Sequence, residues 1–311
     1  MRRAVVTGGA GFIGSNLVDG LLDSGVEVVI FDNLSTGRPE NLTGALARGA
    51  RLHDLDIRDA EGVTTELERV RPHAIFHLAA QIDVRRSVED PALDAQINVQ
   101  GTANLLEGAR RAGVGRFVFS STGGAIYGAA DTVPTPEDAP IRPMAPYGQS
   151  KFCAEGYCHL YQRLHGLSTI CLRYGNVFGP RQDPLGEAGV VAIFCGLAQH
   201  GGGAPRIYGD GNQTRDYVYV GDVVAANLAA AASDACGSVN VGTQTETSVL
   251  ELLEAIQSLV PDAPLEPEHA PARLGELQRS ALDVSRARRE LAWEAGTPLT
   301  GGLEQTLAAR G

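Results

Sequence analysis

The sequence predicts an α/β fold in which a Rossmann-type, doubly wound parallel sheet is followed by a smaller C-terminal α/β lid. Through about the first 175 residues, short β-branched runs alternate with helix-length amphipathic stretches, a pattern typical of a parallel sheet. Beyond this point glycine and proline become frequent and the predicted helices are shorter. We therefore divide the chain into residues 1–175 and 176–311, with an approximate boundary and interleaved segments.

The predicted elements follow in chain order. Strands are expected at residues 3–7, 26–31, 51–54, 74–78, 116–120 and 168–173. Stretches 11–22, 91–111 and 146–165 carry apolar residues at helical spacing and are long enough to connect parallel strands. In the lid, Ser248 and Glu251 have the spacing of a capping box at the start of a helix.

Composition excludes several classes of protein. The 311 residues, 43% of them hydrophobic, suffice for a buried core, and no window approaches the ~20 apolar residues of a membrane span. The net charge of −11, with no basic run longer than two residues, argues against a nucleic-acid partner. The start reads as a strand rather than a signal peptide, and the five cysteines form no CxxC pair, so we expect a cytoplasmic protein with reduced thiols. The seven histidines lack metal-ligand spacing, and no metal is expected.

A glycine pattern predicts a dinucleotide site. Gly8, Gly11 and Gly14 form GxxGxxG between the first strand and the first helix, where backbone N–H groups can point at a pyrophosphate. Asp32 lies 18 residues after Gly14, at the end of the second strand. Its carboxylate can accept hydrogen bonds from both ribose hydroxyls of NAD and would repel the additional phosphate of NADP. NAD is therefore the expected cofactor.

Further residues are expected beside NAD at the same edge of the sheet. Those after the third strand are placed near the adenine, and those after the fourth strand are small residues alongside the cofactor; loop packing is the alternative for both groups. The complete set adds Phe12, Ile13, Asn33, Asp56, Ile57, Leu78, Ala79, Ala80 and Asn98.

A tyrosine and a lysine predict hydride chemistry. Tyr147 and Lys151 are four residues apart on a predicted helix and so share one face, beside the cofactor. A phenol is a poor base at neutral pH, but a nearby ammonium and an oxidised nicotinamide favour the phenolate. The fifth strand ends in Ser121 and Thr122, and one of these hydroxyls is expected to bond the reacting oxygen. Alone, the same YxxxK spacing is common on helix surfaces.

Seven motifs together carry a resemblance. They are TGGAGFIGS at 7–15, DNLS at 32–35, HLAAQ at 77–81, SST at 120–122, YGQSK at 147–151, RYGNVFGP at 173–180 and RDYVYVGD at 215–222. Over nearly its whole length the chain resembles the extended short-chain dehydrogenase/reductase family, in its UDP-galactose 4-epimerase branch. The resemblance implies that Thr122 and Tyr147 act at the sugar 4-hydroxyl and that Lys151 holds the nicotinamide ribose and lowers the tyrosine pKa. Hydride would pass to NAD and return to the other face of a 4-keto sugar.

The resemblance also implies contacts to a UDP-sugar substrate. Arg215 and Arg273 match positions that pair with the diphosphate, where guanidinium groups suit phosphate oxygens. Asn176 matches a sugar-diphosphate contact, and Tyr208 is a candidate to lie against the uracil or to be a core tyrosine. Ser280 stands where members restricted to UDP-glucose and UDP-galactose tend to carry tyrosine, so UDP-GlcNAc and UDP-GalNAc become candidate substrates.

Sister activities stay open as alternatives. Family 4,6-dehydratases place an Asp-Glu pair after the threonine, whereas Gly123 and Gly124 follow Thr122 here, which disfavours dehydration; decarboxylation is equally disfavoured. Arg85 and Arg86 keep a UDP-glucuronate 4-epimerase possible. A non-catalytic NAD-binding regulator is the alternative of another class, although such proteins often lose the tyrosine or lysine. Stretches 91–111 and 146–165 correspond to the family's dimer helices, so a homodimer is expected.

Overall fold

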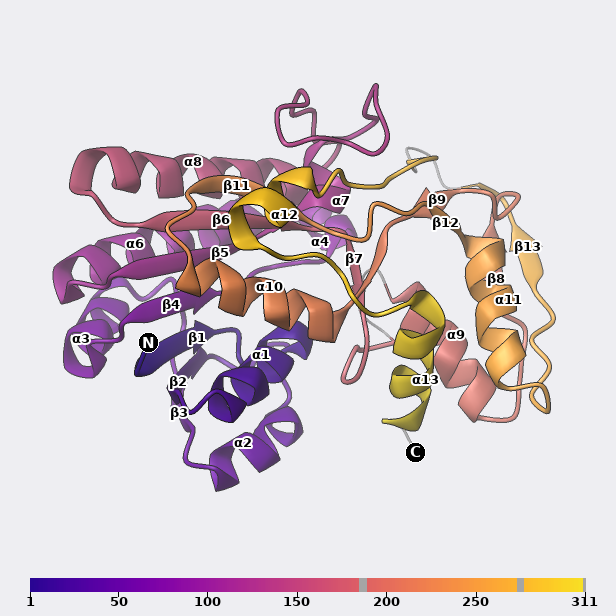
Figure 1. The fold of residues 1–311 in the computed structure, drawn as a ribbon, viewed down its shortest axis with the longest axis horizontal. Helices are drawn as coiled ribbons and strands as arrows, with labels where there is room; N and C mark the ends of the chain where they lie inside the picture. Colours follow the sequence, from indigo (N-terminus) through magenta and orange to yellow (C-terminus); the bar gives the residue numbers. More distant parts are fainter. Residues whose placement is uncertain (185–188, 273–276, 310–311) are drawn as a thin grey trace.

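The computed structural model describes residues 1–184, 189–272 and 277–309 as one large α/β body with a smaller body beside it (Figure 1). The large body is built on a seven-stranded sheet in the order β11-β6-β5-β4-β1-β2-β3, in which all neighbours are parallel. Apart from β11 this is the doubly wound order, with its switch between β1 and β4. Its strands are β1 (Arg3–Thr7), β2 (Glu27–Asp32), β3 (Arg51–Asp54), β4 (Ala74–His77), β5 (Arg116–Thr122), β6 (Thr169–Tyr174) and β11 (Gly237–Val241).

Helices cover both faces of this sheet because successive strand residues point to opposite sides. Val5 packs in the core under one helical layer and Val6 in the core under the other, and both are fully buried. One layer comprises α3 (Ala60–Val70), α6 (Gly101–Ala112) and α8 (Pro146–His165). The other comprises α1 (Phe12–Asp23), α10 (Val220–Ala232) and α12 (Ser285–Leu291). Shorter helical pieces are a 3-10 turn (Pro39–Leu42), α2 (Thr43–Ala47), α4 (Val84–Glu89), α5 (Pro91–Ala95), a π-helical turn (Gln96–Gln100) and α7 (Gly123–Ile126).

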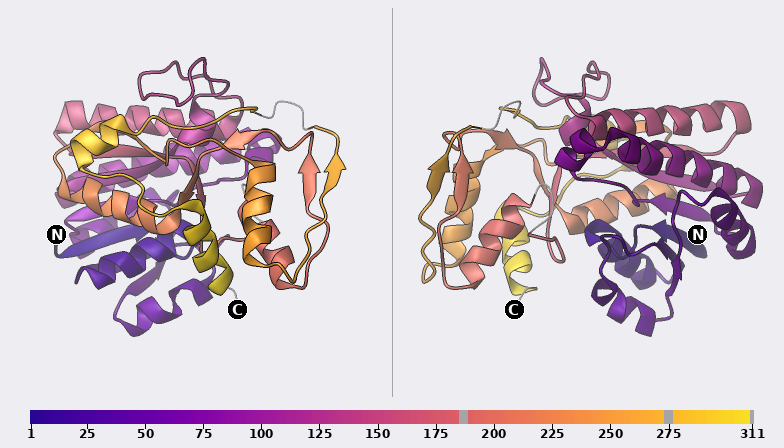
Figure 2. Two further views of the ribbon diagram at one scale, coloured as in Figure 1. Left: turned by 45° about the vertical axis from the view of Figure 1, so that its right-hand side comes forward. Right: turned by 180° about the vertical axis from the view of Figure 1, so that it is seen from behind.

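The smaller body has a core of its own. Its helices α9 (Val190–Gln199), α11 (Val249–Leu259) and α13 (Leu299–Ala308) bury apolar faces against one another, and short strands flank them (Figure 2). Ser248 and Glu251 form the predicted capping box of α11. The short strands form three pairs, β7 (Asn176–Phe178) with β10 (Tyr217–Tyr219), β9 (Thr214–Arg215) with β12 (Thr247–Ser248), and β8 (Arg206–Tyr208) with β13 (Glu268–Ala270).

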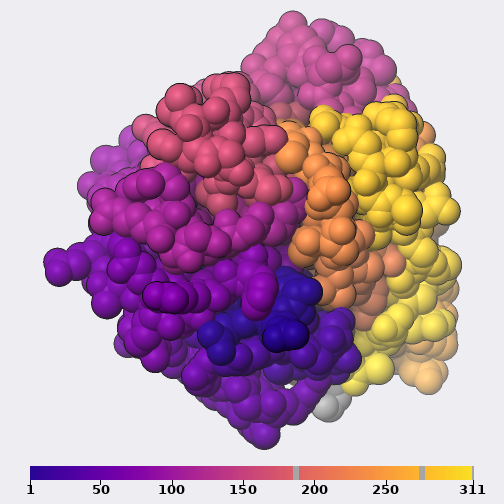
Figure 3. Space-filling model, turned by 60° about the vertical axis from the view of Figure 1, so that its left-hand side comes forward, coloured from indigo at the N-terminus to yellow at the C-terminus, as the bar shows by residue number. Residues whose placement is uncertain are grey.

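The two bodies are interleaved in sequence. After β7 the chain visits the smaller body and then returns as α10 and β11, which completes the large sheet beside β6. Figure 3 shows this from outside, where the orange surface of that segment lies between magenta and yellow surfaces. α10, β11 and α12 follow residue 175 in the sequence but pack in the large body.

The predicted helix at 91–111 also differs in detail. It is one helical stretch, but its middle is the π-helical turn. A π-helix has a wider hydrogen-bond spacing than an α-helix, and an apolar pattern with a period of 3.6 residues does not reveal it. No helix among the described residues is long and apolar enough to cross a membrane. Nor do the described histidine, cysteine and acidic side chains form a group of three able to hold a metal.

Candidate active site

The glycine turn lies between β1 and α1, at the sheet's switch point. Gly8 has φ +69°, and a Cβ added there would lie 2.6 Å from the Ala79 nitrogen after β4. A Cβ on Gly14 would lie 2.1 Å from the Gly8 oxygen, so only glycine lets the helix start this close to the strand. The N-cap Gly11 offers no side chain to the first helical amides, which include Phe12 and Ile13. These amides fit the phosphates of a dinucleotide.

Asp32 ends β2 on the opposite side of this turn. Its carboxylate is 7% exposed and accepts hydrogen bonds from the backbone nitrogens of Ala10, at 2.8 Å, and Leu34, at 2.9 Å. These bonds fix the carboxylate against the glycine turn while leaving lone pairs for ribose hydroxyls. The residues present therefore fit NAD.

The remaining expected cofactor residues divide into two groups. Asn33 donates to Asp56 at 2.9 Å, and Arg58, which also bonds this carboxylate, is the main cause that lowers the pKa of Asp56 to about 2. Ile57 is a core residue. Leu78, Ala79 and Ala80 are partly accessible after β4, whereas the Asn98 side chain is buried among protein partners.

Tyr147 is in the first turn of α8, which begins at Pro146 because proline suits the first helical position. Its side chain keeps part of its surface open although the residue lies deep in the protein. Burial raises the pKa of the phenol to about 12, hydrogen bonding to Thr122 lowers it, and the charge of Asp94 raises it further. Lys151 is not among the groups that shift this pKa, so the lowering expected from its ammonium is not found within the protein itself.

Lys151 follows one turn later and is 3% exposed. Its Nζ donates to the Ser120 oxygen at 2.8 Å and lies 4.8 Å from the centre of the Phe119 ring. Burial is the main cause that lowers the pKa of this ammonium to about 8. It is also the only lysine in the chain, since the other 25 of the 26 basic residues are arginine. This compositional signal points to Lys151 independently of any motif.

The two candidate hydroxyls at the end of β5 have different partners. Ser121 donates to the Glu155 carboxylate at 2.6 Å, within a buried cluster that also contains Arg173. Thr122 caps α7 by accepting from the Ala125 nitrogen, at 3.2 Å, and is the hydroxyl that lowers the pKa of Tyr147. The geometry therefore favours Thr122 for the reacting oxygen.

The lid residues that the resemblance implicates lie on several segments. Asn176 starts β7, and its Oδ1 would be 3.5 Å from a Cβ on Gly124, so its amide faces the turn after Thr122. Arg215 is half-buried and donates to the Leu277 oxygen at 2.8 Å. Tyr208 ends β8, and Ser280 is half-buried outside any element. Arg273 lies outside the described residues.

Sequence reasoning missed two buried polar residues, His77 and Asp216. His77 bonds Thr7 at 2.8 Å and Thr102 at 2.9 Å. Asp216 follows Arg215 in the RDYVYVGD motif and accepts from Leu282 and from the loop after β11. A polar residue inside a predicted apolar strand was the available signal for His77.

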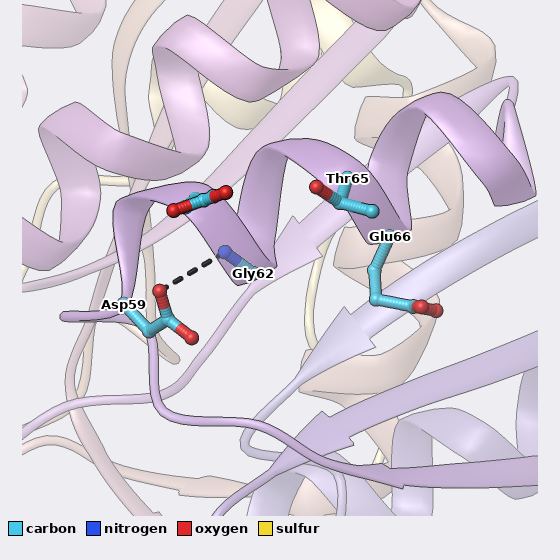
Figure 4. Close-up of a pocket in the computed structure, with 5 residues that line it drawn as sticks. Asp59, Gly62, Thr65 and Glu66 are labelled. Atoms are coloured by element: carbon cyan, nitrogen blue, oxygen red, sulfur yellow. Dashed lines mark hydrogen bonds between the residues drawn. The ribbon is translucent and has the colours of Figure 1, made fainter.

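A surface hollow of about 300 Å³ on α3 is separate from these residues. Figure 4 shows its lining, in which Asp59 accepts from the Gly62 nitrogen as the helix cap. Glu66, on the same helix, pairs with Arg69. These carboxylates have structural partners, so the hollow does not compete with the site at the sheet edge.

The geometry brings a phenol, a threonine hydroxyl and an ammonium together at the carboxyl ends of β4 and β5, next to a glycine turn suited to a pyrophosphate. Such a group can move a proton at a hydroxyl while a cofactor exchanges hydride with the adjacent carbon. The arrangement is therefore suited to reversible oxidation of an alcohol.

Comparison with known proteins gives a consistent result. The model of the NAD dependent epimerase/dehydratase family matches residues 4–242. The UDP-glucose 4-epimerase of Mycolicibacterium smegmatis is 49% identical over 98% of this chain and 97% of its own length. The structure of UDP-glucose 4-epimerase from Thermotoga maritima with UDP-glucose has a TM-score of 0.94 and 44% identity, over 99% of this chain and 98% of its own. The Thermus thermophilus UDP-glucose 4-epimerase complex with NAD has a TM-score of 0.92 and 44% identity, covering 99% of both chains.

Proposed function

The chain belongs to the NAD dependent epimerase/dehydratase family, and from this premise we propose that it is a UDP-hexose 4-epimerase acting on UDP-glucose and UDP-galactose. The observation that carries the proposal is the Tyr147 phenol, close enough to Thr122 for that hydroxyl to lower its pKa, beside buried Lys151 at the sheet edge that holds the glycine turn. The identity of nearly half the chain to UDP-glucose 4-epimerases supports the choice of reaction.

The proposed reaction assigns one task to each residue. Thr122 and Tyr147 bond O4 of the hexose, and Tyr147 takes the O4 proton and later returns it. Bound NAD supplies the hydride acceptor and donor at C4, together with a positive charge that favours the phenolate. The Lys151 ammonium adds positive charge to the same region and is proposed to hold the nicotinamide ribose. Because the sugar regains both proton and hydride, on the other face of C4, no net oxidation results.

In this proposal, the residues that bind the cofactor and the UDP part of the substrate are different from those that act at C4 of the hexose. Gly8, Phe12 and Ile13 fit the cofactor phosphates and Asp32 its ribose, while Asn176 and Arg215 are proposed to contact the substrate diphosphate. Tyr208 is proposed at the uracil and Arg273 at the diphosphate. A hexose held mainly through its nucleotide is free to turn between the two hydride transfers.

The turn after Thr122 argues against dehydration. A Cβ on Gly123 would lie 2.5 Å from Cδ1 of buried Leu282, so a carboxylate side chain at this position has no room. UDP-glucuronate epimerisation has weaker support, because its carboxylate would need a cation and Arg86 is exposed on α4. Retention of Tyr147 and Lys151 argues against a non-catalytic regulator.

Ser280 carries a finer proposal about substrate breadth. Its small side chain would leave space for an N-acetyl group, so we expect turnover of UDP-GlcNAc and UDP-GalNAc. Ser280→Tyr should reduce turnover of the N-acetyl substrates while keeping that of UDP-glucose, measured in a coupled assay. Unchanged activity on both substrate classes would remove the argument.

A homodimer in the cytoplasm is proposed as the setting. Phe152, Tyr157 and Leu164 expose apolar side chains on α8, and all five cysteines are free thiols, which fits a reducing compartment. Light scattering of the purified protein measures the oligomeric state directly.

A substrate panel tests the proposed reaction. UDP-glucose, UDP-galactose, both N-acetyl forms and UDP-glucuronate are incubated separately without added NAD and again with it, and the products are identified. Interconversion at C4 is expected. A 6-deoxy-4-keto or pentose product would instead establish one of the sister activities.

Tyr147→Phe gives the corresponding residue test. Loss of the phenol hydroxyl should lower kcat by about 10²- to 10⁴-fold, the usual range for a general acid or base, with little change in NAD affinity. Tyr157→Phe, on an exposed face of the same helix, is the matched control and should retain wild-type kcat. Equal activity of the two variants would assign the proton to another group.

A further inference from the structure

Asp94 is a buried carboxylate that the reaction as described does not use. It lies on α5 and is 1% exposed. Oδ1 accepts from Gln81 Nε2 and from Asn98 Nδ2, each at 3.1 Å. Oδ2 is also buried and has no hydrogen-bond partner among the described residues. A buried carboxylate with a lone oxygen is costly, so its presence calls for a specific role.

Hydrogen bonds connect Asp94 to the catalytic helix. Asn98 Nδ2 also donates to Ser150 Oγ, at 3.1 Å, and Ser150 in turn donates to the Tyr147 carbonyl oxygen at 3.0 Å. A second branch fixes the segment after β4, because Asn98 exchanges two bonds of 2.9 Å with the Gln81 backbone. The network thus joins the cofactor edge of β4 to the turn that carries the phenol.

The central residue of this hydrogen-bond network, Asn98, is positioned by the π-helical turn. Asn98 lies in the middle of Gln96–Gln100, and the Asn98 amide reaches three acceptors from this position. Such turns are rare and frequently occur at functional sites. Two amide hydrogens shared among three acceptors make Asn98 a junction and not a single contact.

The charge of Asp94 also acts on the catalytic pair. It raises the pKa of Tyr147 and opposes the lowering that burial imposes on the pKa of Lys151. The other titratable groups around Lys151 are Glu155 and Cys158 on α8, Cys171 on β6 and His77 on β4. Glu155 is already paired with Arg173. Asp94 is therefore the carboxylate in this set that has no cationic partner of its own.

We propose that Asp94 is a positioning residue of the active site: its carboxylate fixes the Tyr147 turn through Asn98 and Ser150, and it places a negative charge without a cationic partner behind the catalytic helix. The proposal rests on the 4-epimerase function for the catalytic consequence, although the effect on Lys151 does not require any sugar substrate. A neutral residue at this position would leave Glu155, which is already paired with Arg173, as the remaining carboxylate near the buried ammonium.

The single lysine allows a direct measurement. Protein labelled with ¹³C only in lysine gives one side-chain signal, so NMR titration reports the Lys151 ammonium alone. We expect the wild type to titrate near the pKa of about 8. In Asp94→Asn, which keeps an acceptor oxygen but loses the charge, the midpoint should fall by about one pH unit. Glu89→Gln, an exposed charge loss on α4, is the matched control and should titrate as the wild type.

A second variant separates positioning from charge. Ser150→Ala cuts the link to Tyr147 but leaves Asp94 intact, so its Lys151 midpoint should match the wild type while kcat falls on the order of 10- to 100-fold. Asp94→Asn should lose kcat and shift the activity profile in the same direction as its lysine signal. Wild-type titration in Asp94→Asn, or wild-type kcat in Ser150→Ala, would overturn the proposal. A shifted lysine signal in a chain that turns over no UDP-sugar would refute the epimerase function alone.

Discussion

His77 shows how a single buried residue can be assigned a proton from its neighbours. Thr102 has one hydroxyl hydrogen and uses it toward the Asn98 oxygen at 2.6 Å, so it must accept from His77 Nε2. Nδ1 then accepts from Thr7, whose oxygen accepts from the Ala79 nitrogen at 3.1 Å. With a neutral imidazole, every donor in this series of hydrogen bonds therefore has an acceptor. Burial, with a smaller contribution from the Lys151 charge, holds the pKa of His77 well below its usual value.

This assignment predicts a pH effect on stability. An unfolded histidine protonates near pH 6.5, whereas folded His77 stays neutral, so acid favours the unfolded chain and stability falls below about pH 6.5. Well below pH 6.5, where the unfolded histidine is fully protonated, the slope from His77 approaches a maximum of about 1.4 kcal/mol per pH unit. His77→Gln should lower stability at neutral pH yet show a shallower acid slope, measured as the free energy of unfolding in urea between pH 5 and 7.

The matched control for this slope is Thr102→Ser, which keeps the accepting hydroxyl and should retain the wild-type slope. If His77→Gln and the wild type lose stability in parallel on acidification, the neutral ring is not the source of the effect.

At this scale the sequence could identify residues whose partners are near in the chain. Tyr147 and Lys151 are recognisable because one helical turn separates them, and Asp32 because a strand ends there. Asp94 and Ser121 could not be assigned, because their partners come from other elements, such as Gln81 for Asp94 and Glu155 for Ser121. Adjacent hydroxyls on a strand face opposite ways, and the sequence does not say which side holds the carboxylate.

At the scale of elements, the strand-turn-helix unit β1-α1 depends on the distance between Gly8 and Gly14. Gly14→Ala places a methyl group against the Gly8 oxygen, so α1 must move away from the turn. We expect a loss of about 2 kcal/mol or more in unfolding free energy and a marked loss of NAD affinity, because the helical amides are displaced. Urea unfolding and NAD titration measure the two effects.

Gly44→Ala provides the comparison on α2. A Cβ there meets no atom within 4 Å, so the substitution should be neutral or stabilising by up to about 1 kcal/mol, with unchanged NAD affinity. Comparable losses in both variants would mean that helix composition, and not close approach at the turn, controls the site.

The elements themselves were predictable where the local sequence pattern, strand or helix, was continuous. The strand at 3–7, that at 51–54 and the helix at 146–165 begin and end as expected, and other strands in the first part differ by one or two residues. β11 was not anticipated. Ser238 and Asn240 point into a polar cluster, where Ser238 donates to Glu155 at 2.9 Å, so the strand lacks the apolar run of its neighbours.

At the scale of the whole molecule, the chain crosses between the two bodies more than once, so segments distant in sequence meet where the bodies join. We call this place the joint. Asp216 occupies that joint, 1% exposed between β9 and β10. Oδ1 accepts from the nitrogen and hydroxyl of Thr243, each at 2.7 Å. Oδ2 accepts from the nitrogens of Gln244 and Leu282, each at 3.1 Å. One carboxylate therefore ties together three segments that are distant in sequence.

Asp216→Asn tests whether this joint controls the stability of the whole chain. Whichever way the new amide is turned, its NH₂ group faces at least one backbone N–H, which leaves buried donors without acceptors. We expect a loss of about 2–5 kcal/mol in unfolding free energy. Asp210→Asn, on an exposed turn of the same body, should cost less than about 0.5 kcal/mol.

Because Leu282 covers Gly123 beside Thr122, Asp216→Asn should also lower kcat in protein that is still folded. Full kcat with reduced stability would show that the joint supports the fold without positioning the active site.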